Sequence, residues 1–158
     1  MLVVFDPGLG FTNGGGWFYW PETDDKTNFG YTMKYNKKAT KVQGSLLLIR
    51  HLSDGYIFRV KSNALSGLAL ADEGSFGWAT FSGKATYREP GWVEPIGGHK
   101  FVVYVEDHDE SGVGVDRFWI EVRDRDGNVV TLSMDPIAVD NAEVLGGGNI
   151  VVPHTDSK

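Results

Sequence analysis

The segment "DRFWIEVRDRDGNVV", residues 116–130, decides the fold that this sequence specifies. Apolar and charged residues alternate through its first half, which is typical of a β-strand with one buried face. Asp126-Gly127 follows, and this dipeptide predicts a tight hairpin turn because such turns need the positive φ that glycine adopts readily. The side chains expected to face the core are Phe118, Ile120 and Val122.

Three further segments carry the same period-two pattern: "YIFRVKS" (56–62), "WATFSGKATYR" (78–88) and "HKFVVYVED" (99–107). Asp54-Gly55 predicts a second hairpin, and Asn13-Gly14 suggests a third turn. Glycine and alanine at inward positions of residues 78–88 predict a bent strand that lies close to another backbone. The residues expected to face inward are Tyr56, Phe58, Val60, Ala79, Phe81, Gly83, Ala85, Tyr87, Phe101, Val103 and Val105.

The length and composition fit one β-rich domain. The chain has 158 residues, which is the size of a single domain, and its 21 glycines favour strands joined by tight turns. We therefore predict a single all-β domain over residues 1–152, built as an antiparallel β-barrel or a two-sheet β-sandwich of about ten strands. Residues 153–158 are expected to form a flexible C-terminal tail.

The charge and the missing residue types exclude several classes of function. A net charge of −6 argues against nucleic acid as a partner, because proteins that bind it carry basic patches. The sequence contains no cysteine, which excludes disulfides, thiolate nucleophiles and zinc–cysteine sites. No apolar run approaches the ~20 residues of a membrane span, so no membrane insertion is expected.

A run of four aromatic residues, Trp17-Phe18-Tyr19-Trp20, follows three glycines. On a strand, Trp17 and Tyr19 point to one face, and Phe18 and Trp20 point to the other. One pair enters the core. The second pair is either covered by a neighbouring segment, such as residues 2–5, or left as a surface for a sugar or peptide. Burial of both pairs is the interpretation that we favour at this point.

Tryptophans at outward positions indicate a ligand surface. Trp78 and Trp119 alternate with inward residues, and Trp92 lies in a loop rich in proline and glycine. Aromatic rings line ligand pockets and can stack on the apolar face of a sugar. The candidate ligand-binding residues are Trp78, Trp119, Trp17 and Trp92. The interpretation that we favour at this point is that another strand or loop covers these rings.

The segment "EDHDESGVGVD", residues 106–116, is rich in carboxylates. Ca²⁺ prefers several carboxylate and carbonyl oxygens, so a calcium site is one interpretation of this loop. Its candidate ligands are Asp107, Asp109, Glu110 and Asp116. The alternative is a solvated loop whose charges keep strand edges from pairing with other molecules. No other cofactor is expected, because the sequence lacks phosphate-loop, dinucleotide-binding and H-E-x-x-H motifs.

Histidines and carboxylates leave a catalytic alternative open. His51, His99 and His108 are scattered without metal-ligand spacing, yet a fold can bring such residues to one metal. Glu106 and Glu121 are a possible catalytic pair on outward strand faces. Neighbouring arginines offer them ion-pair partners, which makes ion pairing the simpler role.

Several segments resemble a known domain family. They are "FSGKATYREPG" (81–91), "HKFVVYVEDHDESGVGVDRFWIEVRDRDGNVV" (99–130) and "LGGGNIVV" (145–152), with "FGYTMKYNKKATKVQGSLLLIR" (29–50) upstream. Together they resemble a β-rich accessory domain of exported bacterial and archaeal multidomain surface proteins, which follows anchoring or Ig-like modules. The likeness extends over residues 15–152. It implies an extracellular location and neighbouring domains as partners, and it supplies no catalytic residues.

Three functions follow from these observations. The first is a non-catalytic extracellular accessory or binding domain of a prokaryotic surface or secreted protein. The second is a β-barrel that binds carbohydrate or another small ligand through exposed tryptophans. The third is a small hydrolase with a carboxylate or histidine–metal site. The first is the one that we favour from the sequence.

Overall fold

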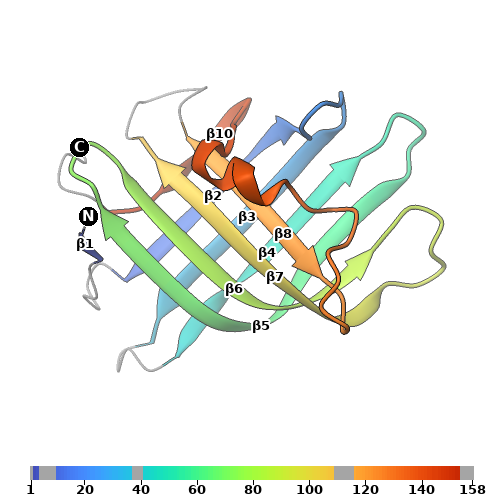
Figure 1. The fold of residues 1–158 in the computed structure, drawn as a ribbon, viewed down its shortest axis with the longest axis horizontal. Coiled ribbons are helices and arrows are strands. Elements are labelled where there is room, and N and C mark those ends of the chain that lie inside the picture. Colours follow the sequence, from blue (N-terminus) through green and yellow to red (C-terminus); the bar gives the residue numbers. More distant parts are fainter. Residues whose placement is uncertain (1, 4–9, 37–40, 109–115, 154–158) are drawn as a thin grey trace.

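The computed structural model of the chain describes residues 2–3, 10–36, 41–108 and 116–153, and most of them lie in β-strands (Figure 1). One short 3₁₀-helix, η1, spans Pro136–Asn141. The predicted all-β antiparallel fold of about ten strands is confirmed. The strands are β1 (Leu2–Val3), β2 (Phe11–Tyr19), β3 (Lys26–Tyr35), β4 (Val42–His51), β5 (Ile57–Asp72), β6 (Gly77–Arg88), β7 (Ile96–Asp107), β8 (Arg117–Arg123), β9 (Glu143–Val144) and β10 (Gly147–Val151).

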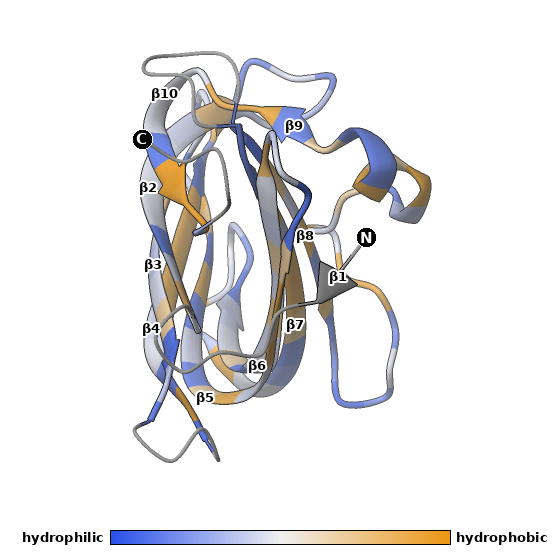
Figure 2. Cartoon of the chain, turned by 90° about the vertical axis from the view of Figure 1, so that its left-hand side faces the viewer, coloured by the Kyte–Doolittle hydropathy of each residue, from blue (hydrophilic) through white to orange (hydrophobic). Residues whose placement is uncertain are grey.

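The strands form one sheet that curls into a half-barrel. They follow one another in the order β10-β2-β3-β4-β5-β6-β7-β8-β9, and β1 pairs with one end of β5. All of these pairings are antiparallel. The curl places β2, β3 and β4 opposite β6, β7 and β8, with β5 at the bend, as Figure 2 shows. The fold is therefore one continuous sheet, and the core lies between its two halves.

Two register shifts in β5 accompany the bend of the sheet. The pairing of β5 with β6 shifts between Ser62 and Ala64 and again between Leu65 and Gly67. Bulges of this kind bend a strand and increase its twist. Beside the first shift, a Cβ atom on Gly83 of β6 would lie only 2.1 Å from the Ala64 carbonyl oxygen. The predicted close approach of two backbones at the small residues of β6 is confirmed.

The predicted inward faces of β6, β7 and β8 are buried. Phe118 of β8 stacks on Phe29 of β3 at 4.4 Å between ring centroids, and it packs against Phe18 of β2 at 5.5 Å. These contacts join the two halves of the curled sheet. Tyr56 is an exception, because it precedes β5 and is 60% exposed, so its predicted inward position is wrong.

The aromatic run at the end of β2 divides its side chains between two environments. Phe18 and Trp20 are buried in the core, at 1% and 6% exposed, whereas Tyr19 is 52% exposed. Burial of both pairs is therefore wrong for Tyr19. Trp17 is partly buried, and its ring packs against the backbone of residues 146–147, as described below.

The C-terminal part of the chain connects the two edges of the curled sheet. β9 pairs with β8, whereas β10 pairs with β2. Between these strands, the Leu145 N–H donates to the Asp116 carbonyl at 3.0 Å, and the Gly146 N–H donates to the Trp17 carbonyl at 2.8 Å. Residues 147–151 form β10, which contributes to closing the core.

Close backbone contact between β2 and β10 explains the glycines in both segments. A Cβ atom on Gly16 would lie 2.2 Å from the Gly147 carbonyl oxygen, and Gly148 has a φ of 101°, which favours glycine. Asn13 and Gly14 pair with β10 inside β2. The turn suggested at Asn13-Gly14 is therefore wrong.

Both predicted Asp-Gly turns are confirmed, but the strand expected to follow the second turn, residues 128–134, is wrong because that segment forms no strand. Gly55 has a φ of 90° and Gly127 a φ of 83°. After Gly127 the chain touches β8 in one isolated bridge, between Arg123 and Val129, and then leads into η1 beside β8, outside the curled sheet (Figure 1). Within the described ranges, no helix is long and apolar enough to cross a membrane.

Candidate functional site

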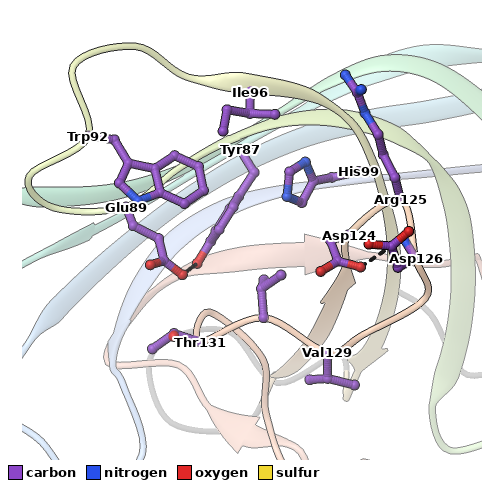
Figure 3. Close-up of a pocket in the computed structure, with 11 residues that line it drawn as sticks. Tyr87, Glu89, Trp92, Ile96, His99, Asp124, Arg125, Asp126, Val129 and Thr131 are labelled. Atoms are coloured by element: carbon purple, nitrogen blue, oxygen red, sulfur yellow. Dashed lines mark hydrogen bonds between the residues drawn. The ribbon is translucent and has the colours of Figure 1, made fainter.

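The candidate binding site is a pocket at one end of the curled sheet, which we call the end pocket. It lies between the loop that follows β6 and the turn that follows β8 (Figure 3). Its volume of about 530 Å³ falls in the range of small-molecule sites. The polar and aromatic residues that matter most in its lining are Tyr87, Glu89, Trp92, His99, Asp124 and Arg125.

A tight turn places Glu89 and Trp92 side by side in this pocket. The Trp92 N–H donates to the Glu89 carbonyl at 3.1 Å, and Gly91 has a φ of 86°. Proline at the second position and a positive-φ glycine at the third are the requirements of a type II turn, and Pro90-Gly91 meets them. The Arg88 guanidinium donates to the Trp92 carbonyl at 3.1 Å and holds the far end of the turn.

Tyr87 fixes the position of the Glu89 carboxylate. The Tyr87 hydroxyl donates to Glu89 Oε2 at 2.7 Å and accepts from the Leu132 N–H at 3.3 Å. Burial, with the Glu89 carboxylate as a second cause, raises the pKa of Tyr87 far above its ordinary value. Tyr87 therefore stays protonated and acts as a donor to Glu89. Its ring also meets the Trp92 ring edge-on at 5.5 Å between centroids.

His99 is a buried residue in the lining of the end pocket. It is only 4% exposed, and the centroid of its ring lies 5.0 Å from that of the Tyr87 ring. His99 Nδ1 lies 3.3 Å from the Gly97 carbonyl oxygen. Because a carbonyl only accepts, this contact places a proton on Nδ1 and leaves Nε2 as an acceptor in the neutral ring.

The turn after β8 supplies the opposite wall of the end pocket. Asp124 Oδ1 accepts from the N–H groups of Asp126 and Asn128 at 2.9 and 3.0 Å, which holds the turn in shape. The Arg125 side chain runs across Gly98, where a Cβ atom would lie 2.6 Å from Arg125 Nε. Figure 3 shows Arg125 on the side of the pocket away from Glu89 and Trp92.

A second pocket, which we call the outer groove, contains two of the predicted tryptophans. It has a volume of about 390 Å³ on the outer face of β6, β7 and β8, and both Trp78 and Trp119 line it. Trp119 is only 6% exposed, and its indole N–H donates to the Asp135 carbonyl just before η1. The favoured expectation that a neighbouring segment covers this ring is therefore confirmed for Trp119. Trp78 is partly exposed, and its indole N–H donates to Glu73 at 2.9 Å.

Trp17 lines neither the end pocket nor the outer groove. Its ring covers the backbone of β10, because a Cβ atom on Gly146 or Gly147 would lie 2.4 or 2.6 Å from ring atoms. Lys26 Nζ lies 4.7 Å from the ring centroid in a cation–π contact. The ring is thus engaged within the fold, which gives it a structural role in packing β10 onto β2.

Two of the predicted calcium ligands bind the backbone of β10 and of the residue that follows it. Asp107 Oδ2 accepts from the Val152 N–H at 2.8 Å, and Asp116 Oδ2 accepts from the Ile150 N–H at 2.8 Å. Asp116 Oδ1 also accepts from the His108 N–H at 3.0 Å. Burial raises the pKa of Asp116, and the hydrogen bonds from Ile150 and His108 oppose that rise.

The other predicted ligands, Asp109 and Glu110, lie outside the described residues. In the part of the chain that the structure describes, no three histidine or carboxylate side chains gather as a metal site would require. His51, His99 and His108 therefore do not meet at a common metal site. The calcium site stays a prediction.

The two outward glutamates occupy separate places on the sheet. Glu106 is opposite Arg117, and Glu121 is opposite Val102, so their positions differ by four residues, roughly 13 Å along the strands. Glu106 accepts from the Tyr104 hydroxyl at 2.6 Å and lies 2.6 Å from His108 Nε2. Paired carboxylates in glycosidases lie closer together, at ~5–9.5 Å.

Comparison with known proteins adds no relative: no family model matches the chain, and neither a curated protein nor a solved structure is significantly similar to it. The resemblance to exported surface-protein domains therefore stays a prediction that rests on the quoted segments.

Sequence reasoning found Trp92 but missed Glu89 and His99 as its neighbours. The tetrapeptide from Glu89 to Trp92 has the form x-Pro-Gly-x, and this was the available signal, because a type II turn brings its end residues together. No local signal connects this turn to Asp124 and Arg125. Their approach depends on how β6, β7 and β8 pair.

Proposed function

We propose that this chain is a non-catalytic extracellular accessory domain of a prokaryotic surface or secreted protein, and that it binds a carbohydrate in the end pocket. The observation that carries the binding proposal is the position of the Trp92 ring beside the Glu89 carboxylate in an open pocket of about 530 Å³ (Figure 3). The resemblance of residues 15–152 to exported domains supports the extracellular part.

Sugar rings combine apolar faces with many hydroxyl donors, and the end pocket offers surfaces for both. Trp92 and Ile96 provide apolar area, and Glu89 and Asp124 provide carboxylate acceptors. Hydrogen bonds to charged groups contribute about 1.5–3 kcal/mol each, which is enough to orient a polar ligand. The turn contacts that fix Glu89 and Trp92 mean that little order has to be gained on binding.

Trp92→Ala is expected to weaken the binding of the recognised oligosaccharide at least about fivefold, because the aromatic contact contributes more than about 1 kcal/mol. Titration calorimetry with a panel of neutral and charged oligosaccharides measures the change. Because Trp92 packs at the edge of the core, the melting temperature of the variant is compared with that of the unsubstituted chain to exclude unfolding.

Trp78→Ala is the matched control, since Trp78 is also partly exposed but lines the outer groove. It is expected to leave oligosaccharide affinity unchanged. The outer groove is the second candidate site, because the rings of Trp78 and Tyr104 lie 5.8 Å apart beside the 39% exposed Val102. Loss of binding in Trp78→Ala with retention in Trp92→Ala would transfer the site to the outer groove and contradict the proposal.

A further inference from the structure

The lining of the end pocket is negatively charged. Three carboxylates, those of Glu89, Asp124 and Asp126, line it together with one guanidinium, that of Arg125, which leaves a formal charge of −2. The whole chain carries a charge of −6. A pocket of this sign in an acidic protein attracts cations and repels anions over a range of several ångströms.

Glu89 has an acceptor to offer a ligand. Its Oε2 atom accepts from the Tyr87 hydroxyl, but among the described residues no group donates to its Oε1 atom. The Tyr87 contact and the turn to Trp92 fix the carboxylate in place. A fixed carboxylate oxygen beside an aromatic ring suits a positively charged donor, because the ring face attracts cations as well.

His99 provides an independent sign that a ligand belongs in this pocket. The residue is 4% exposed, its ring lines the pocket, and Nδ1 is engaged with the Gly97 carbonyl. Within the described parts of the chain, Nε2 has no partner. A buried acceptor without a partner costs free energy, which a ligand that donates a hydrogen bond would restore.

Arg125 does not neutralise the Glu89 carboxylate. Its side chain is held across Gly98, which has a φ of 76°, and it extends from the side of the pocket opposite Glu89 and Trp92 (Figure 3). The guanidinium forms no ion pair with any residue of the described ranges. Among the described residues that line the pocket on the side of Glu89 and Trp92, none is a cation, and the nearby Arg88 guanidinium is engaged with the Trp92 carbonyl outside the lining (Figure 3).

We infer that the end pocket selects amino sugars with a free ammonium group, which would lie between the Glu89 carboxylate and the Trp92 ring while a hydroxyl group of the sugar donates toward His99 Nε2. This inference rests on the proposed carbohydrate function and specifies its ligand class. The ammonium supplies the donors and the positive charge that this half of the pocket lacks, and the sugar ring supplies the apolar face.

The test compares three soluble tetrasaccharides by titration calorimetry at low salt: one of glucosamine, one of N-acetylglucosamine and one of glucose. The glucosamine tetramer is expected to bind about tenfold to a hundredfold more tightly than the other two, which is the range for one charged hydrogen bond. Glu89→Gln keeps an acceptor for the Tyr87 hydroxyl but removes the charge, so it is expected to fold normally and to abolish most of this preference.

Glu94→Gln is the matched control. Glu94 is an exposed carboxylate in the same loop but does not line the pocket, so its loss is expected to leave the preference intact. If Glu94→Gln reduces the preference as much as Glu89→Gln does, general attraction between charges explains the result and the inference is wrong. Arg125→Gln is expected to maintain or strengthen binding of the glucosamine tetramer.

The outcomes separate this inference from the function on which it rests. If all three tetramers bind equally and Trp92→Ala weakens all of them, the carbohydrate site stands and the amino-sugar preference is wrong. If none binds, or if binding survives Trp92→Ala, the proposed function itself is wrong. Tight binding of a galacturonic acid tetramer that Arg125→Gln removes would show an anionic ligand and overturn the inference.

Discussion

Phe118→Asp is expected to yield a chain that does not fold. Phe118 is fully buried and stacks on Phe29 while it contacts Phe18, so one side chain joins both halves of the curled sheet. Truncating a buried phenylalanine costs about 3–5 kcal/mol, and a carboxylate without a partner in its place costs several more. The total approaches the ~5–15 kcal/mol by which domains are stable. Circular dichroism and the melting temperature measure the loss.

Tyr19→Asp is the control for that variant. Tyr19 is also an aromatic residue of a strand, but it is 52% exposed, and the new carboxylate would face water. Its effect on stability is expected to be no more than about 1 kcal/mol. If Phe118→Asp were soluble with a native-like melting curve, the inward orientation of Phe118 and the core described for β8 would both be wrong.

The sequence predicts the inward faces well because burial on one side of a strand imposes a period of two on its residues. Phe118, Val103 and Phe81 follow that period and are buried. Trp119 lies on the predicted outward side and is buried there for a non-local reason: the segment before η1 covers the outer face of β8 and binds its indole N–H. Period-two patterning records which side of a strand a residue occupies, but not what later covers that side.

The glycines of β2 show a second limit. Asn13-Gly14 has the composition of a tight turn, yet these residues lie in mid-strand opposite β10. Turns and close backbone contacts both require glycine, and only the partner strand, more than a hundred residues away in the chain, distinguishes them. The reverse holds at Glu89 and Trp92, whose proximity is local and follows from the Pro90-Gly91 turn.

Asp116→Ala is expected to loosen β10 and to destabilise the fold strongly. The carboxylate, at 4% exposed, accepts from the backbone N–H groups of Ile150 and His108, and both donors would lose their partner. Each buried donor left without an acceptor costs about 1–3 kcal/mol. Urea unfolding measures the stability, and faster hydrogen exchange at the Ile150 amide would report the loosened strand.

Asp54→Ala is the control for Asp116→Ala, because Asp54 also accepts from a backbone N–H, that of Tyr56, but in an exposed turn. There water replaces the lost acceptor, and the expected change is below about 1 kcal/mol. Equal effects of the two substitutions would mean that burial does not make the Asp116 contacts important and that β10 is held mainly by its pairing with β2.

Asp116 also makes stability depend on pH in a direction that its burial determines. Because burial raises its pKa above the ordinary value of 3.8, the folded chain keeps this proton to higher pH than the unfolded chain does. The contribution of Asp116 to the free energy of unfolding therefore falls as pH rises from 3.8 through the raised pKa. Above the raised pKa this contribution no longer changes with pH. Asp116→Asn removes this titration, so the stability of the unsubstituted chain relative to the variant is expected to decrease with pH over that interval. An increase instead would mean that the hydrogen bonds from Ile150 and His108 outweigh burial and hold the carboxylate ionised.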